Sequence, residues 1–305
     1  MSAAGAERSD VAIQPGRLTG VVQTPGASPV QRPAPALRRP RLSRFRGDIR
    51  DLLARARRLE SAEPEEYGFD LDTASWLYLI TTSFYRWYFR TQVFGIEHLP
   101  RGPVILVANH GSHVLSWDGA NILTACLLDA DPPRLVHGMG GHRLMELPFL
   151  GRVASRIGAV DGRRPACTRI LEHGGVVLTF PEGIKALARP FRERYQLLQF
   201  GSGFVHVALA TGAPIVPVAV VGSEEEAPML ANPGWIQRLT RTPVAPITPT
   251  LVVPLPVRYR LHFGTPIHVR GPATPDRVAD GVAEVRDALI ALLARGLRTR
   301  PNIFF

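Results

Sequence analysis

Apolar residues recur along this chain with helical spacing near the N-terminal end, and the pattern predicts two helices there. From Leu42 to Leu59 the apolar positions return every three or four residues while arginines fill the positions between them, which predicts an amphipathic basic helix. From Thr73 to Thr91 aromatic and aliphatic residues cover most of the helical circumference. We expect this second helix to be buried in a core or half-buried in lipid.

Beyond Gly95 short apolar runs alternate with helical stretches, which is typical of an α/β domain. The predicted strands are Val104 to Ala108, Arg134 to Gly138, Val176 to Phe180, Ile215 to Val221, and a late pair near Leu251 to Phe263 and Pro266 to Val269. The predicted helices are Gly119 to Leu128, Pro165 to Glu172, Phe204 to Thr211 and Pro275 to Arg298. Unbroken apolar strands need cover on both faces, so we predict a mixed, mostly parallel sheet flanked by helices.

Two segments lack any hydrophobic period. Residues 1–40 are rich in Pro, Gly, Ala and Arg, a composition that cannot offset the entropy of ordering, so we expect a disordered tail. Asn232 to Thr250 contains many prolines and is expected to form an irregular loop or lid. The predicted organisation is a tail over 1–40, helices over 41–93 and one α/β domain over 94–305.

The charge of the chain lies mostly near its N-terminus. The formal net charge is +10, and the first sixty residues hold twelve arginines against five acids, so about seven of the ten excess charges lie there. Only Lys185 is a lysine. Arginine forks onto phosphate and carboxylate, which indicates an anionic partner. We expect an anionic membrane surface and no nucleic acid, with the basic helix either docked on the domain or lying on the membrane.

The sequence predicts peripheral attachment rather than insertion. Residues 1–40 contain no apolar core of a secretory signal peptide. The apolar segment from Trp76 to Phe89 is shorter than the roughly 20 residues a transmembrane helix needs, and it contains Arg86. Cys126 and Cys167 form no disulfide framework, which fits a reducing compartment. We therefore expect a monotopic protein on the cytoplasmic side of a membrane, without a signal peptide or a transmembrane span.

The densest group of reactive side chains follows the predicted strand Val104 to Ala108. His110, His113 and Asp118 lie between this strand and an apolar helix, where α/β folds usually bind ligands. An imidazole that donates one ring N–H to a carboxylate keeps its other nitrogen as a base for a hydroxyl proton. These three residues are the predicted catalytic group, and either imidazole can be the base.

A second polar group follows the predicted strand Val176 to Phe180. Glu182 and Gly183 begin it, and four cations within ten residues come next: Lys185, Arg189, Arg192 and Arg194. Such a cluster beside a catalytic group suits the binding of phosphate, and a solvated surface turn is the alternative.

These motifs, taken in order, resemble the glycerolipid acyltransferases of the lysophosphatidate (1-acylglycerol-3-phosphate) acyltransferase type. The resemblance covers about residues 94–263. It rests on three blocks: Asn109-His110 through Asp118, Phe180-Pro181-Glu182-Gly183, and Ile215-Val216-Pro217-Val218.

The resemblance implies a glycerol-3-phosphate acyltransferase-like fold over 94–305 and a peripheral O-acyltransferase of lipid metabolism. Its donor is implied to be acyl-CoA or acyl carrier protein as co-substrate, its acceptor a lipid hydroxyl, and no cofactor or metal is implied. In the family the histidine is the general base and the aspartate orients it, with no acyl-enzyme. Glu182 and Gly183 of the Phe180-Pro181-Glu182-Gly183 block and the nearby Lys185 are then implied to bind substrate, with Arg192 and Arg194 as candidates for its phosphates.

Two departures from the family pattern bear on the site. His113 has the family's four-residue spacing to Asp118, whereas His110 has the family's position after Asn and the strand. The family has a further block between the Asn109-His110 block and the Phe180-Pro181-Glu182-Gly183 block, with an arginine thought to hold acceptor phosphate. Gly162 stands where that arginine would fall, and Arg163 follows it as a candidate substitute. A less charged acceptor such as mono- or diacylglycerol is therefore an alternative to lysophosphatidate.

Two other functions are open at this point. One is a non-catalytic membrane-lipid binding or tethering protein on an acyltransferase fold. The other is a metal-dependent hydrolase that uses His110, His113 and Asp118 as ligands.

Overall fold

The computed structural model describes residues 42–60, 68–112, 116–140, 150–240, 247–249 and 253–304. The predicted tail over 1–40 and the candidate His113 lie outside these ranges.

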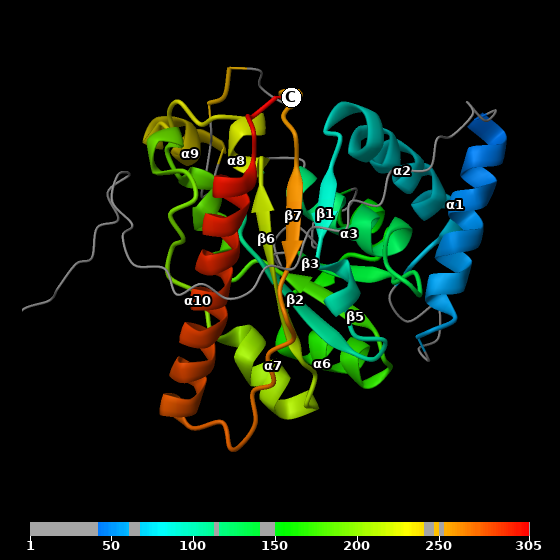
Figure 1. Ribbon diagram of the computed structural model, residues 1–305, viewed down its shortest axis with the longest axis vertical. Coiled ribbons are helices and arrows are strands. Elements are labelled where there is room, and N and C mark those ends of the chain that lie inside the picture. Colours follow the sequence, from blue (N-terminus) through cyan, green and yellow to red (C-terminus); the bar gives the residue numbers. More distant parts are fainter. Residues whose placement is uncertain are drawn as a thin grey trace, which may run out of the picture. The chain divides into compact units, whose positions relative to one another are not determined.

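The described residues form one seven-stranded mixed sheet (Figure 1). Its strands are β1 (Gln92–Phe94), β2 (Val104–Ala108), β3 (Val136–Gly140), β4 (Val160–Asp161), β5 (Val176–Thr179), β6 (Ile215–Val221) and β7 (Arg260–Phe263). Their order across the sheet is β1-β7-β6-β2-β5-β3-β4, and each described pair is parallel except β6 with β7. The predicted fold class, a mostly parallel sheet flanked by helices, is confirmed.

Helices cover both faces of the sheet (Figure 1). On one face α6 (Arg164–Glu172), α7 (Gly203–Thr211) and α10 (Pro275–Thr299) pack against alternate strand residues such as Ile105 and Val177. On the other face α3 (Trp117–Leu128) and the π-helical turn η2 (Phe84–Tyr88) pack against residues such as Leu106 and Leu178. Because the central strands are covered on both sides, every residue of β2 and β6 is buried.

Helix α1 (Leu42–Arg57) is docked on the rest of the fold. Its apolar residues Ile49, Leu53 and Ala56 are buried in a cluster that also contains residues of α2 (Leu71–Ser83) and α3. Arg46 and Arg50 reach Asp72 at the start of α2, with N–O distances of 3.3 and 3.2 Å. The sequence left open whether this helix docks on the domain or lies on the membrane. In the structure its apolar face is turned toward the protein.

The second predicted helix is shorter than its pattern suggested. Asp70 caps α2 by accepting a hydrogen bond from the Thr73 amide at 2.7 Å, and regular helix ends at Ser83. The π-helical turn η2 follows, and β1 begins at Gln92. The aromatic and aliphatic side chains of α2 and η2 are only partly buried, because Trp76, Ile80 and Trp87 are 51, 51 and 60% exposed.

The segment between β6 and β7 is more regular than expected at its start and less regular at its end. The short helices α8 (Ser223–Glu226) and α9 (Gly234–Thr240) occupy the first part, and Ala231 bridges to Ile247. Of the strand expected over Leu251 to Phe263, residues 253–263 are described, and strand begins there only at Arg260, since Pro254 and Pro256 lack the amide hydrogens that a strand pair needs.

The remaining helical pieces are short. They are η3 (Ile96–His98), α5 (Leu150–Arg156), η4 (Gly183–Ala188) and η5 (Phe191–Glu193).

Candidate active site

The three central strands bring the sequence motifs to one edge of the sheet. Strand β2 lies between β5 and β6 and is parallel to both, so the segments that follow these strands leave the sheet at the same edge. These segments begin with Asn109 after β2, Phe180 after β5 and Gly222 after β6. Asn109 also ties β2 to β6, because its side chain exchanges two hydrogen bonds with the backbone of Val220 at 3.0 and 2.8 Å.

His110 and Asp118 form a hydrogen-bonded pair at this edge. The His110 Nδ1 atom lies 2.7 Å from Asp118 Oδ2, and the two side chains are 12% and 0% exposed. With Nδ1–H donated to the carboxylate, the imidazole has Nε2 as its remaining proton acceptor. The ring of Phe180 stacks on His110 with centroids 4.2 Å apart and planes 20° apart, which fixes the plane of the imidazole.

Asp118 is held by a ring of donors. Besides His110, its carboxylate accepts hydrogen bonds from the amides of Gly111, Ser112 and Gly119 at 2.9, 3.1 and 2.7 Å. The Ser116 hydroxyl donates to it at 3.0 Å, from a residue with a φ of 44°. Burial by itself raises the pKa of Asp118, but His110 and the amides outweigh burial and lower it below 3.8. The carboxylate is therefore charged at neutral pH.

Glu182 is part of the frame of the site rather than an open ligand. Its carboxylate is fully buried and accepts hydrogen bonds from the amides of His110 and Leu198 at 3.2 and 2.7 Å. It also pairs with the buried guanidinium of Arg189. Both carboxylate oxygens of Glu182 therefore have hydrogen-bond partners, and Glu182 holds the backbone of His110 in place.

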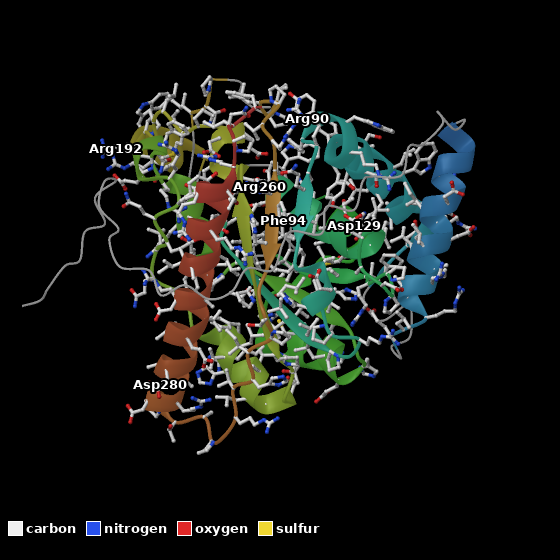
Figure 2. All side chains as sticks on the ribbon, in the orientation of Figure 1. Arg90, Phe94, Asp129, Arg192, Arg260 and Asp280 are labelled. Carbon is white, nitrogen blue, oxygen red and sulfur yellow. The ribbon has the colours of Figure 1, made fainter. Side chains whose placement is uncertain are left out.

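The other predicted cations lie around this frame and not within it. Lys185 is exposed in η4, as is Gly183. Arg192 is 81% exposed and pairs with its neighbour Glu193, and Figure 2 shows it at the outer surface. Arg194 stacks over the Phe191 ring.

Arg163 does not approach the histidine in any described contact. It is 69% exposed and its Nε lies 2.8 Å from Asp161 Oδ2.

Three consecutive buried glutamates follow β6, and the sequence analysis did not single them out. Glu224 pairs with Arg189 at 2.8 Å, and Glu225 pairs with Arg300 at 2.7 Å. Glu226 has a different partner, the hydroxyl of Tyr259 at 2.5 Å. Three acidic residues directly after a buried strand were the available signal in the sequence, but their partners come from distant positions.

A cavity of about 230 Å³ lies under the site on the α6 and α7 side of the sheet. Its wall is mostly apolar and contains Arg164 as its charged residue, and Phe180, whose ring stacks on His110, is also one of its lining residues. Val207 of α7 also lines this cavity.

The backbone amides of two glycines in the motifs donate hydrogen bonds within the protein. The Gly111 amide donates to Asp118 and the Gly183 amide donates to the Phe180 carbonyl at 3.0 Å.

Within the described ranges, no group of three or more His, Cys, Asp or Glu side chains is arranged to hold a metal ion. His113 lies outside these ranges. The helices of these ranges include none that is both long and apolar enough to cross a membrane.

Comparison with known proteins adds three similarities. A sequence model of the family described as Acyltransferase matches residues 90–221. The chain is 36% identical to an uncharacterized protein of Mycobacterium tuberculosis over 257 residues, which is 79% of this chain and 71% of that protein. It is 25% identical to the human "DGAT1/2-independent enzyme synthesizing storage lipids" over 218 residues, 70% of this chain and 63% of that enzyme.

The fold is also that of a solved structure. The 1-acyl-sn-glycerophosphate (LPA) acyltransferase PlsC from Thermotoga maritima matches with a TM-score of 0.52 and 18% identity. The match covers 86% of this chain and 96% of that one.

Proposed function

This chain belongs to the glycerolipid acyltransferase family, and we propose that it transfers a fatty acyl group from acyl-CoA or acyl carrier protein to a hydroxyl of a glycerolipid or related lipid alcohol. The observation that carries the proposal is the His110–Asp118 pair with Nδ1 tied to the carboxylate. A base of this kind at the edge of an α/β sheet is suited to remove a hydroxyl proton.

The proposed reaction has one chemical centre and no covalent enzyme intermediate. His110 Nε2 takes the proton of the acceptor hydroxyl while the oxygen attacks the thioester carbonyl carbon. The new C–O bond forms and the C–S bond breaks. The leaving thiolate takes the proton from the imidazolium, which gives the free thiol and restores the neutral imidazole. Asp118 stabilises that imidazolium through its charge and fixes the tautomer that leaves Nε2 free.

The 230 Å³ cavity is the proposed binding site for the acyl chain of the donor or the acceptor. Its apolar wall suits a hydrocarbon, and one of its lining residues, Phe180, also contacts His110.

We propose an acceptor with little or no charge, such as mono- or diacylglycerol, over lysophosphatidate. Gly162 takes the place of the expected arginine, and Arg163 forms an ion pair with Asp161. The human relative is named for storage lipid synthesis, which also favours a neutral acceptor.

We propose that the protein binds anionic membranes peripherally through α1, α2 and η2. Trp76, Ile80 and Trp87 present exposed apolar area, and Arg50 and Arg55 are exposed on α1. Aromatic residues at the headgroup level and arginines near anionic lipid are the usual elements of such a surface.

The proposal is tested by incubating the purified protein with palmitoyl-CoA and vesicles that contain lysophosphatidate, monoacylglycerol or diacylglycerol. We expect thiol release that depends on an acceptor, with the acylated lipid identified by mass spectrometry and the neutral acceptors preferred. Vesicle binding without transfer to any acceptor, with palmitoyl-CoA or palmitoyl acyl carrier protein as donor, would favour a tethering function instead.

A further inference from the structure

A chain of hydrogen bonds joins the His110–Asp118 pair to a buried carboxyl in helix α8. Ser112 lies between the two residues of the pair in sequence and is fully buried. Its amide donates to Asp118 Oδ2 at 3.1 Å, and its hydroxyl accepts a hydrogen bond from the Asp118 amide at 2.9 Å. These two reciprocal bonds fix the start of α3, and with it the direction of the Asp118 carboxylate.

The next members of the chain are Tyr259 and Glu226. The Tyr259 hydroxyl lies 3.0 Å from Ser112 Oγ and 2.5 Å from Glu226 Oε2. Tyr259 is 0% exposed and Glu226 is 1% exposed, so water does not compete for these bonds. The chain therefore runs from Asp118 through Ser112 and Tyr259 to Glu226 without leaving the interior.

Glu226 differs from its two neighbours in having no cation. Glu224 pairs with Arg189, and Glu225 with Arg300, but no described cationic side chain pairs with Glu226. The groups that face it are Tyr259, Ser112 and the charged Asp118, together with the Leu255 amide, which donates to its backbone carbonyl.

Burial raises the pKa of Glu226 to about 8, and the Asp118 charge adds to that effect. A buried carboxyl without a cation is thus held mainly in its neutral form near pH 7.

We propose that Tyr259 and Glu226 are positioning residues for the reaction, which act through Ser112 to hold Asp118 against His110. This inference rests on the proposed acyltransferase function. It gives the segment between β6 and β7 a role, because Glu226 ends helix α8 near the start of that segment and Tyr259 is its last residue. Neither residue touches the imidazole, so each acts only through the hydrogen-bond chain.

The same helix offers a matched control. The Tyr195 hydroxyl donates to Glu225, the neighbour of Glu226, and accepts from the Gly222 amide at 2.7 Å. This second tyrosine–glutamate pair has no described contact with Ser112 or Asp118. Tyr195→Phe therefore removes the same kind of bond in the same helix without breaking the proposed chain.

The test compares Tyr259→Phe, Tyr195→Phe, Glu226→Leu and Glu226→Gln by their kcat and KM for transfer from palmitoyl-CoA to the best acceptor of the panel. We expect Tyr259→Phe to lower kcat roughly tenfold, the effect of one lost buried hydrogen bond, with KM within about twofold. Tyr195→Phe should leave both constants within about twofold. Glu226→Leu should lower kcat as Tyr259→Phe does, because leucine cannot accept the Tyr259 hydrogen bond, whereas Glu226→Gln, which is neutral, similar in shape and still accepts it, should lower kcat less.

A second readout does not depend on activity. The NMR signal of the His110 Nδ1 proton, measured on histidine-labelled protein, should shift upfield in Tyr259→Phe, because a less fixed Asp118 accepts a weaker hydrogen bond from it. It should not shift in Tyr195→Phe. If the unchanged protein transfers no acyl group, the proposed function fails, and this signal still decides the positioning role.

The inference is overturned if Tyr259→Phe matches Tyr195→Phe in kcat and in the His110 proton signal. It is also overturned if Glu226→Leu keeps the kcat of the unchanged protein, or if Glu226→Gln loses as much of it as Glu226→Leu.

Discussion

The Nδ1 atom of His110 lies 2.7 Å from the Oδ2 atom of Asp118, although the two residues are eight positions apart. The intervening chain turns so that the amides of Gly111 and Ser112 point at the same carboxylate oxygen. A longer loop than the usual family spacing can therefore still form the histidine–aspartate contact. His110, which has the family's position after the strand, is paired with Asp118, and His113 lies outside the described residues.

Asp118→Asn should lower the rate of transfer at least about a hundredfold, because the amide cannot stabilise the imidazolium and does not impose the required tautomer. The measurement is kcat at neutral pH, with thermal unfolding as a control for the fold.

The same substitution changes the pH dependence of stability. The lowered pKa of Asp118 contributes stability above about pH 4, and that contribution is lost as the pH falls through the lowered pKa. Urea unfolding between pH 2 and 6 should show this loss in the unchanged protein and not in Asp118→Asn. A loss of the same size in both proteins would contradict it.

Arg189→Met should lower the free energy of unfolding by about 3–5 kcal/mol, since it leaves Glu182 and Glu224 buried without their cation. Lys185→Met is the control, because that cation is exposed, and it should change stability by less than about 0.5 kcal/mol. Urea unfolding measures both. Equal effects of the two variants would show that the buried ion pairs are not the frame of the site.

The fold was predictable from the sequence where a single local pattern decides the structure. The apolar runs of β2 and β6 predicted both strands with their observed bounds, since a central strand needs an unbroken apolar run. The short strands β1 and β4, with three and two residues, carry no period of their own and were missed. Neighbouring strands define them, and a local pattern does not contain that information.

The site was predictable only as far as its residues cluster in sequence. His110, Asp118 and Glu182 lie in short motifs and were found. Tyr259 lies 147 positions from Ser112, and only the folded sheet brings their hydroxyls together. The buried state of Glu182 was also hidden, because it depends on Arg189 seven residues later.

Val207→Phe should shift the preference of the protein to shorter acyl chains, because the larger ring fills part of the cavity. Val207→Ala enlarges the same cavity and should shift the preference to longer chains. The measurement is the relative kcat/KM with acyl-CoA donors, and then acceptors, of different chain length. Opposite shifts in the two variants support the assignment. An unchanged chain-length profile in both would show that this cavity does not bind the acyl chain.

Trp76→Ala combined with Trp87→Ala should weaken binding to vesicles at every salt concentration, because apolar contact is not screened. Arg50→Gln combined with Arg55→Gln should instead weaken binding mainly at low salt and reduce its salt dependence. Sedimentation with phosphatidylglycerol-containing vesicles measures both. Binding that neither double variant changes would place the membrane contact elsewhere on the molecule.

The most direct test of the account is a comparison of His110→Ala and His113→Ala in the acyl transfer assay, with circular dichroism and thermal unfolding to confirm that both variants fold. The account predicts that His110→Ala lowers kcat by about a thousandfold or more, since it removes the general base, and that His113→Ala keeps measurable transfer. Transfer that survives in His110→Ala, or is lost only in His113→Ala, would contradict it.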